Sequence, residues 1–235
     1  MIAGWPALDG CSTLAHRGGA ALGPANTLEV VERSVAAGAH AVEIDLQELA
    51  DGSLVLFHDS SVEIQGVRVR LAEIDARALS EAIGEPVVQL AGLLAAIAEQ
   101  AVGLYLDVKR VSAIGLLRAI DTICATTVAE RTVIGSFDRR VVGTVSLDGR
   151  LRASILYRDR HLDPLELALS LGCAAVHPCF DDEPWMVQEL AGEWMERVHS
   201  AGLAVVGWNS NDAELLAAMR VAGFDVLCTD DPRLA

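Results

Sequence analysis

Acidic residues stand two positions apart inside apolar runs of this sequence. Glu43 and Asp45 share one run, and Asp107 stands at the end of another, two residues before Lys109. Side chains two apart on a strand point to the same side, and charges inside an apolar strand are rarely buried without a partner. Converging carboxylates repel unless a cation neutralises them, and an all-oxygen ligand set selects Mg²⁺, Ca²⁺ or Mn²⁺ over zinc. The pattern therefore predicts that Glu43, Asp45 and Asp107 hold one divalent cation.

Lys109 is the only lysine among 18 basic residues, and all the others are arginine. Such a bias indicates that this position needs a compact ammonium rather than a planar guanidinium. A point charge of this kind suits a phosphoryl oxygen beside a metal ion.

Two histidines, His16 and His58, bracket the first two carboxylates. Phosphodiester cleavage beside a metal requires a base for the attacking hydroxyl and an acid for the leaving alkoxide. Imidazole serves either role near neutral pH. We assign His16 as the base and His58 as the acid, although the residue pattern alone also fits the reverse order.

Short strand-like runs alternate with longer helix-like runs along the whole chain. The strand candidates are Ser12–His16, Ala41–Leu46, Gly103–Val108, Thr132–Ser136, Arg152–Leu156, Ala174–His177, Ala204–Trp208 and Asp225–Cys228. The helix candidates between them include Thr27–Ala37, Gln89–Glu99, Ser112–Ala125, Arg139–Leu147, Pro164–Leu171, Pro184–Ser200 and Asn211–Ala222. Eight such units predict a (β/α)8 TIM barrel, whose last helix is cut short after Pro232. An open doubly wound sheet is the alternative, but no GxGxxG follows the first strand.

The strand-like run Ser53–His58 interrupts this alternation. Asp51-Gly52 precedes it and is typical of a tight hairpin turn. We therefore expect an extra strand that folds back antiparallel on the second strand and places His58 opposite Asp45.

Catalytic groups of a β/α barrel gather at the carboxyl ends of its strands. By this criterion Arg158, His177 and Trp208 are further candidates for substrate contacts, and His161 could approach the same mouth.

The composition limits the classes of partner. The chain has 235 residues with a formal charge of −15, which suits a single barrel domain over 1–235 and disfavours nucleic acid or anionic membrane surfaces. The five cysteines have no zinc-ligand or CxxC spacing, so we expect free thiols in a reducing compartment. The start of the chain lacks a basic, then apolar, signal, and a cytoplasmic location is expected. Nothing in the sequence indicates the oligomeric state.

The ordered set of motifs resembles the glycerophosphodiester phosphodiesterase family, which is related to the phosphatidylinositol-phospholipase-C-like phosphodiesterases. The motifs are His16-Arg17-Gly18, Asn26-Thr27, Glu43-Ile44-Asp45, His58-Asp59, Asp107-Val108-Lys109, Ser136-Phe137, Trp208-Asn209, Gly223-Phe224-Asp225 and Thr229-Asp230-Asp231-Pro232. The resemblance implies a β/α barrel with one Mg²⁺ or Ca²⁺ that hydrolyses glycerophosphodiesters to glycerol 3-phosphate and an alcohol. It also implies metal binding by Glu43, Asp45 and Asp107, acid–base catalysis by His16 and His58, and phosphate binding by Arg17 and Lys109.

Three positions depart from the family pattern. Ala25 stands where the family usually has glutamate before Asn-Thr, and Asp107 stands where it usually has a glutamate. The segment after Asp59 is short and lacks the usual arginine and glycine-rich stretch, so we expect a more open site.

Two alternative functions fit the same sequence. One is a phospholipase or sphingomyelinase D-type phosphodiesterase on the same barrel, but the sequence has no aromatic cluster or basic face suited to lipid. The other is a degenerate barrel that binds a phosphodiester without cleaving it.

Overall fold

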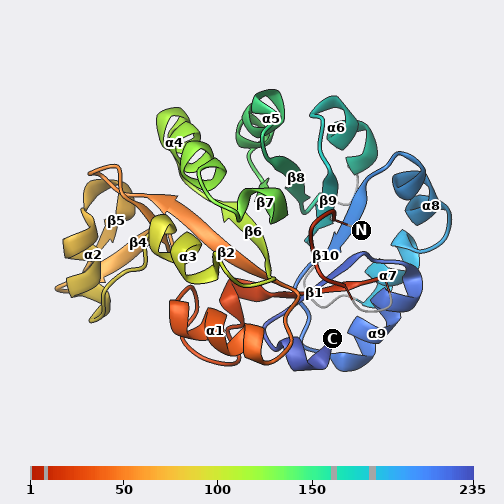
Figure 1. Ribbon diagram of the computed structural model, residues 1–235, viewed down its shortest axis with the longest axis horizontal. Coiled ribbons are helices and arrows are strands. Elements are labelled where there is room, and N and C mark those ends of the chain that lie inside the picture. The colour runs from red at the N-terminus through yellow and green to blue at the C-terminus, as the bar shows by residue number, and fades with distance from the viewer. Residues whose placement is uncertain (1, 8–9, 160–162, 180–183) are drawn as a thin grey trace.

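The computed structural model describes residues 2–7, 10–159, 163–179 and 184–235, and in them eight parallel strands close into a barrel with helices around it (Figure 1). In order around the barrel the strands are β1 (Ser12–Ala15), β2 (Ala41–Glu48), β6 (Gly103–Val108), β7 (Thr132–Ser136), β8 (Arg152–Tyr157), β9 (Ala175–Pro178), β10 (Ala204–Gly207) and β11 (Val226–Thr229). The ring closes because β1 pairs with both β2 and β11. The predicted (β/α)8 barrel is confirmed.

The helices that cover the barrel follow the expected alternation. They are α1 (Leu28–Ala36), α3 (Leu90–Ile97), α4 (Ala113–Cys124), α5 (Arg139–Asp148), α6 (Pro164–Ser170), α7 (Pro184–Leu190), α8 (Glu193–Ser200) and α9 (Ala213–Ala222). Several begin at a side-chain cap: Thr27 accepts from the Val30 amide and Ser112 from the Gly115 amide. Short 3₁₀ turns are η1 (His16–Gly18), η2 (Leu71–Glu73), η3 (Ala129–Arg131) and η4 (Pro232–Leu234). The truncated final helix is the turn η4.

The long helix expected over Pro184–Ser200 is wrong, because α7 and α8 are separate helices. Gly192 lies between them with φ +70° and ψ −126°, far from helical values. Glycine adopts positive φ without a steric penalty, so the helix can end here and a new helix can begin in another direction.

The predicted hairpin is confirmed. Strand β3 (Leu54–Leu56) pairs antiparallel with the end of β2, outside the ring. At the turn, Gly52 has φ +82° and the Asp51 carboxylate accepts a hydrogen bond from the Ser53 amide at 2.9 Å. The hairpin lengthens β2 beyond the barrel wall.

The expected register of His58 is wrong by one residue. Leu46 pairs with Leu56, and the amide of the next residue, Phe57, donates to the Asp45 carbonyl at 3.1 Å. Phe57 therefore lies opposite Asp45, and the strand has already ended. The chain leaves the ladder before His58, so the pleat of the strand does not set the direction of its imidazole.

A small unit between β3 and α3 was not anticipated. Strands β4 (Ser61–Ile64) and β5 (Val67–Arg70) form a hairpin, followed by helix α2 (Ala76–Ile83). In Figure 1 this unit projects from the end of β2, away from the barrel. Its core is separate from the main one and consists of Leu49, Val55, Leu71 and Leu79. The short segment expected after Asp59 is thus a folded extension.

The barrel core has two layers. Inward-facing residues such as Leu14, Tyr105 and Val133 pack in the interior, while their strand neighbours pack against the helices. Trp5 closes the end where the strands begin, since its indole packs edge-on against Tyr105 and its Nε1 donates to the Arg131 carbonyl at 2.8 Å. A Cβ on Gly103 would lie 2.6 Å from that indole nitrogen, so only glycine leaves room for Trp5 at this position.

Other sequence expectations meet simple outcomes. All five cysteines are free, and three of them are buried. His161 lies outside the described residues. Across the described ranges no helix is both long and apolar enough to cross a membrane.

Replacing Trp5 should destabilise the barrel without changing the carboxylate cluster. We expect Trp5→Ala to lower the free energy of unfolding by about 3–5 kcal/mol, because a large buried side chain leaves a cavity. Urea unfolding followed by circular dichroism measures the change. Trp5→Phe should cost clearly less, and an equal loss in both variants would contradict the packing explanation.

Candidate active site

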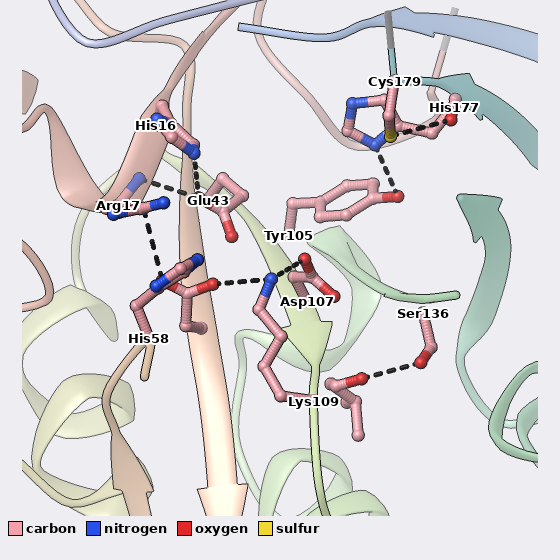
Figure 2. A network of polar contacts seen from close by, with 12 residues as sticks. His16, Arg17, Glu43, His58, Tyr105, Asp107, Lys109, Ser136, His177 and Cys179 are labelled. Carbon is pink, nitrogen blue, oxygen red and sulfur yellow. Dashed lines mark hydrogen bonds and ion pairs between the residues drawn. The ribbon is translucent and has the colours of Figure 1, made fainter. Parts of the chain in front are cut away.

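Three buried carboxylates form the centre of the site at the carboxyl ends of β2 and β6. Glu43 and Asp45 come from β2, and Asp107 lies beside Asp45 in the parallel register of β6. One oxygen from each lies within 4.8 Å of the others, and each residue is at most 1% exposed. Figure 2 shows Asp107 on β6, and Lys109 just after it, facing a group formed by His16, Arg17, Glu43 and His58. The structure thus brings the predicted carboxylates together.

Neighbouring groups fix the orientation of two of these carboxylates. The Arg17 amide donates to Glu43 Oε2 at 2.7 Å. Asn26 clamps Asp45 from two sides: its Nδ2 donates to Asp45 Oδ2 at 2.8 Å, and its Oδ1 accepts from the Asp45 amide at 3.1 Å. Lys109 Nζ lies 3.0 Å from Asp45 Oδ1 and also binds Asp107 Oδ2.

Burial and mutual repulsion shift the ionisation of the cluster. Burial, with Asp45 and Asp107 nearby, raises the pKa of Glu43 well above its usual value. Burial also raises the pKa of Asp107, against the attraction of Lys109. Asp45 differs, because Lys109 and Asn26 outweigh its burial and hold its pKa below the usual value. One ammonium therefore does not compensate three carboxylates.

Two oxygens of the cluster are suited to bind a cation. Glu43 Oε1 and Asp107 Oδ1 are buried, and neither has a hydrogen-bond partner among the described residues. A buried acceptor without a partner costs about 1–3 kcal/mol, and more when it is charged. Hard divalent cations bind carboxylate oxygens of this kind. The donor set therefore fits Mg²⁺, Ca²⁺ or Mn²⁺.

His16 lies beside the cluster and is oriented by a carboxylate. Its Nδ1 lies 2.6 Å from Asp230 Oδ1, which follows β11, and its Nε2 lies 4.0 Å from Glu43 Oε2. A carboxylate only accepts, so Nδ1 carries the proton and the neutral ring leaves Nε2 as the basic nitrogen. Asn211 also donates to Asp230, at 2.7 Å.

His58 stands at the rim rather than in the interior. Its side chain is 41% exposed, and its Nδ1 lies 2.8 Å from Asp59 Oδ1. The Gln47 amide donates to the carbonyls of His58 and Asp59 at 2.9 and 2.6 Å, which ties this loop to β2. A positive charge on His58 would favour the ionised forms of Asp45 and Asp107, which places its ring near the cluster.

A strained turn after β1 positions Arg17. Arg17 has φ +51°, an unusual conformation for a non-glycine residue. A Cβ on Gly19 would lie 1.9 Å from Ser34 Oγ on α1, so the turn packs directly on that helix. Arg17 Nε lies 3.7 Å from Asp45 Oδ2 and is buried without a hydrogen bond. Ala25 is exposed and offers this guanidinium no acceptor.

Aromatic residues form the opposite wall of the mouth. Trp208 packs against His16 at 5.6 Å between ring centroids and against His177 at 5.0 Å. The Arg158 guanidinium lies over the rings of Phe137 and Trp208, at 5.5 and 6.0 Å. His177 is fully buried, its Nδ1 is 3.0 Å from the Tyr105 hydroxyl, and burial lowers its pKa well below the usual value. It is therefore a neutral residue behind Trp208.

The sequence analysis gave no role to three residues that orient this site. Asn26, Asp59 and Asp230 each stood in a quoted motif without an assigned role. Their signal was a short polar residue at the end of a strand or before a helix, which equally indicates a cap or a turn. Only the closed barrel shows which neighbour each one contacts.

Comparison with known proteins yields consistent matches. The model of the glycerophosphoryl diester phosphodiesterase family matches residues 16–234. A glycerophosphodiester phosphodiesterase of Caldanaerobacter subterraneus is 25% identical over 236 residues, covering 93% of each chain. Among solved structures, a putative glycerophosphodiester phosphodiesterase of Galdieria sulphuraria superposes with a TM-score of 0.82 at 21% identity, covering 94% of each chain. A phosphodiesterase of Oleispira antarctica in complex with sn-glycerol-3-phosphate gives 0.77 at 20% identity, also covering 94% of each chain.

Because the pKa of Glu43 is raised, the ionisation of this residue should affect the stability of the folded protein. A carboxyl whose pKa is raised on folding favours the folded state below its usual pKa, and this contribution disappears as the pH rises through the raised value. At neutral pH Glu43 therefore opposes folding unless a cation is bound. We expect Glu43→Gln to raise the Tm of the metal-free protein by a few degrees, at about 2–4 °C per kcal/mol.

The same variant should lose its response to metal. For the wild type, Mg²⁺, Ca²⁺ or Mn²⁺ at a hundred times its dissociation constant adds about 2.7 kcal/mol, which differential scanning fluorimetry detects. Glu29→Gln, an exposed change on α1, should keep that response. If none of the three ions changes the Tm of the wild type, the metal site is refuted.

Proposed function

The chain belongs to the glycerophosphoryl diester phosphodiesterase family, and on that premise we propose that it hydrolyses glycerophosphodiesters to glycerol 3-phosphate and an alcohol. The observation that carries this proposal is the buried triad of Glu43, Asp45 and Asp107 flanked by two carboxylate-oriented histidines. The glycerol 3-phosphate complex of the Oleispira relative supports the same substrate class.

The proposed resident cofactor is one divalent cation held by Glu43, Asp45 and Asp107. When bound, it would polarise a phosphoryl oxygen and lower the pKa of a neighbouring hydroxyl or water. The remaining chemistry belongs to side chains of the protein.

We assign the base to His16 because its environment matches that task. Asp230 holds the Nδ1 proton, so Nε2 is free to accept the proton of the attacking group. Attack by water gives glycerol 3-phosphate directly, whereas attack by the glycerol hydroxyl gives a cyclic phosphodiester that water must then open. The negative charge of Asp230 also stabilises the imidazolium that forms. The edge of Trp208 packs on this ring and helps to exclude water.

We assign the acid to His58. Its exposed position at the rim allows exchange with solvent, so it can be reprotonated after each turnover. Asp59 on Nδ1 leaves Nε2 to donate a proton to the departing oxygen.

Phosphate binding is proposed for Arg17 and Lys109. Lys109 already bridges Asp45 and Asp107, and those two carboxylates raise its pKa despite its burial. A permanently charged ammonium there compensates the negative charge that develops in the transition state. Trp208 and Arg158 are proposed to contact the substrate from the opposite wall, and His177 to act through Trp208.

A hydrolysis screen tests the whole proposal. Glycerophosphocholine, glycerophosphoethanolamine and glycerophosphoserine are incubated with Mg²⁺, Ca²⁺ or Mn²⁺ and again with EDTA, and glycerol 3-phosphate is measured enzymatically. We expect release with at least one ion and none with EDTA. His16→Ala and His58→Ala should each reduce kcat about a hundred-fold or more, the usual worth of general acid–base catalysis. Activity within a few-fold of wild type in both variants would exclude the two-histidine mechanism.

Asp230 offers a separate test of the base assignment. Asp230→Asn removes the charge behind His16 Nδ1 and lets the ring adopt the wrong tautomer, so kcat should fall at least about ten-fold while metal affinity stays unchanged. A kcat that stays at the wild-type value would show that Asp230 does not orient His16 for catalysis.

A further inference from the structure

A cleft opens beside Lys109. It has a volume of about 610 Å³ and lies between the end of β2, the β4–β5 extension and the loops that follow β6 and β7. Gln47 and Lys109 belong both to its lining and to the network around the carboxylates. The cleft therefore borders the site of the proposed reaction at Gln47 and Lys109.

The cleft lies on the side of His58. Gln47 holds the carbonyls of His58 and Asp59, and Ser60, the next residue along the chain, lines the cleft. If His58 protonates the departing oxygen, the alcohol leaves next to this cleft. The inference below rests on the proposed function for this step.

The lining is cationic in an acidic protein. It contains four basic residues, Arg70, Lys109, Arg110 and Arg140, and two acidic ones, Glu48 and Asp138. The chain as a whole has 18 basic and 33 acidic residues. Basic residues therefore outnumber acidic ones in the lining, the reverse of the chain as a whole.

Both acidic residues of the lining are already engaged. Glu48 accepts from the Ser112 amide at 2.6 Å and from Arg118 at 2.9 Å. Asp138 caps α5 and binds the Arg140 guanidinium at 2.8 Å. Neither carboxylate is available to bind a cationic head group.

Arg110 is the uncommitted charge of the cleft. Within the part of the chain that the structure describes, no carboxylate lies within ion-pair distance of its guanidinium, and its side chain is exposed to the cleft. Arg70 and Arg140, in contrast, are paired with Glu73 and Asp138.

The aromatic wall of Trp208 and Phe137 also disfavours a cationic alcohol. Quaternary ammonium groups bind to the faces of aromatic rings. Here the Arg158 guanidinium already lies over both Phe137 and Trp208, so a choline group would meet a like charge at these rings.

From these observations we propose that the cleft receives the departing alcohol, and that Arg110 selects alcohols bearing an anionic group such as a carboxylate. A guanidinium binds a carboxylate through two parallel hydrogen bonds. The specificity of the enzyme for the alcohol would then come from the loop after β6, outside the catalytic groups.

Two diesters that differ by one carboxylate test this proposal. Glycerophosphoserine and glycerophosphoethanolamine share every other group of the alcohol, so the ratio of their kcat/KM values isolates the carboxylate. We expect the wild type to favour the serine diester. Arg110→Gln should reduce the ratio about ten-fold, which corresponds to one charge-assisted hydrogen-bonded pair. Arg110→Lys should retain part of the preference, and Arg110→Glu should reverse it.

The matched control is Arg150→Gln, which removes an exposed arginine before the start of β8, at the opposite end of the barrel. It should leave the ratio unchanged. A ratio that is equally unchanged in Arg110→Gln, or a wild type that favours the ethanolamine diester, overturns the inference while the hydrolase proposal stands. Failure of the wild type to hydrolyse either diester with any of the three ions overturns the inference, and the hydrolase proposal falls with it only if glycerophosphocholine is also left intact.

Discussion

Like charges held together in the interior govern this structure. Glu43, Asp45 and Asp107 place oxygens within 4.8 Å of one another, where water cannot screen their repulsion. A protein tolerates such a cluster only if other groups supply compensating positive charge. Lys109 and the Arg17 guanidinium each supply one charge beside Asp45, and the partial positive charges of the Arg17 amide and the Asn26 side-chain amide add to them. Glu43 Oε1 and Asp107 Oδ1, which have no hydrogen-bond partner among the described residues, carry negative charge that these neighbours leave uncompensated.

Much of the surrounding architecture serves to hold that cluster in place. The αL turn at Arg17 aims an amide at Glu43, and it packs on α1 so closely that only glycine fits at Gly19. The β2–β3 hairpin extends β2 past the barrel wall and returns the chain to the mouth, where Gln47 holds the His58 loop. Interior packing contributes at the other end, since Trp5 and Tyr105 fill the barrel beneath the cluster.

Local patterns predicted a large share of this molecule. The alternation of strands and helices gave the closed barrel, and Asp51-Gly52 gave the hairpin, because both depend on interactions near in sequence. The spacing of Glu43 and Asp45 in an apolar strand sufficed to bring them to one face, and β6 placed Asp107 beside them. The roles assigned to these residues remain proposals.

What the sequence did not reveal depends on contacts made far along the chain or at its surface. The partnership of His16 with Asp230 spans 214 positions and exists only because β1 pairs with β11. The register of His58 was missed because β3 ends two residues before it, so the pleat no longer applied. The β4–β5 hairpin and α2 were not predicted because many of their side chains are partly exposed. Val67, for example, is 62% exposed, and its strand lacks the clear alternation of apolar and polar residues that marks a half-buried strand.

The closure of the ring between β1 and β11 has a consequence for the order in which the molecule is built. The proposed metal ligands come from β2 and β6, in the first half of the chain, whereas the proposed base and the carboxylate behind it come from the first and last strands. A chain emerging from the ribosome can therefore complete its cation ligands long before β11 exists. Only when the final strand is inserted does His16 acquire Asp230. The proposed cation site would thus be complete well before the proposed base gains the carboxylate that orients it.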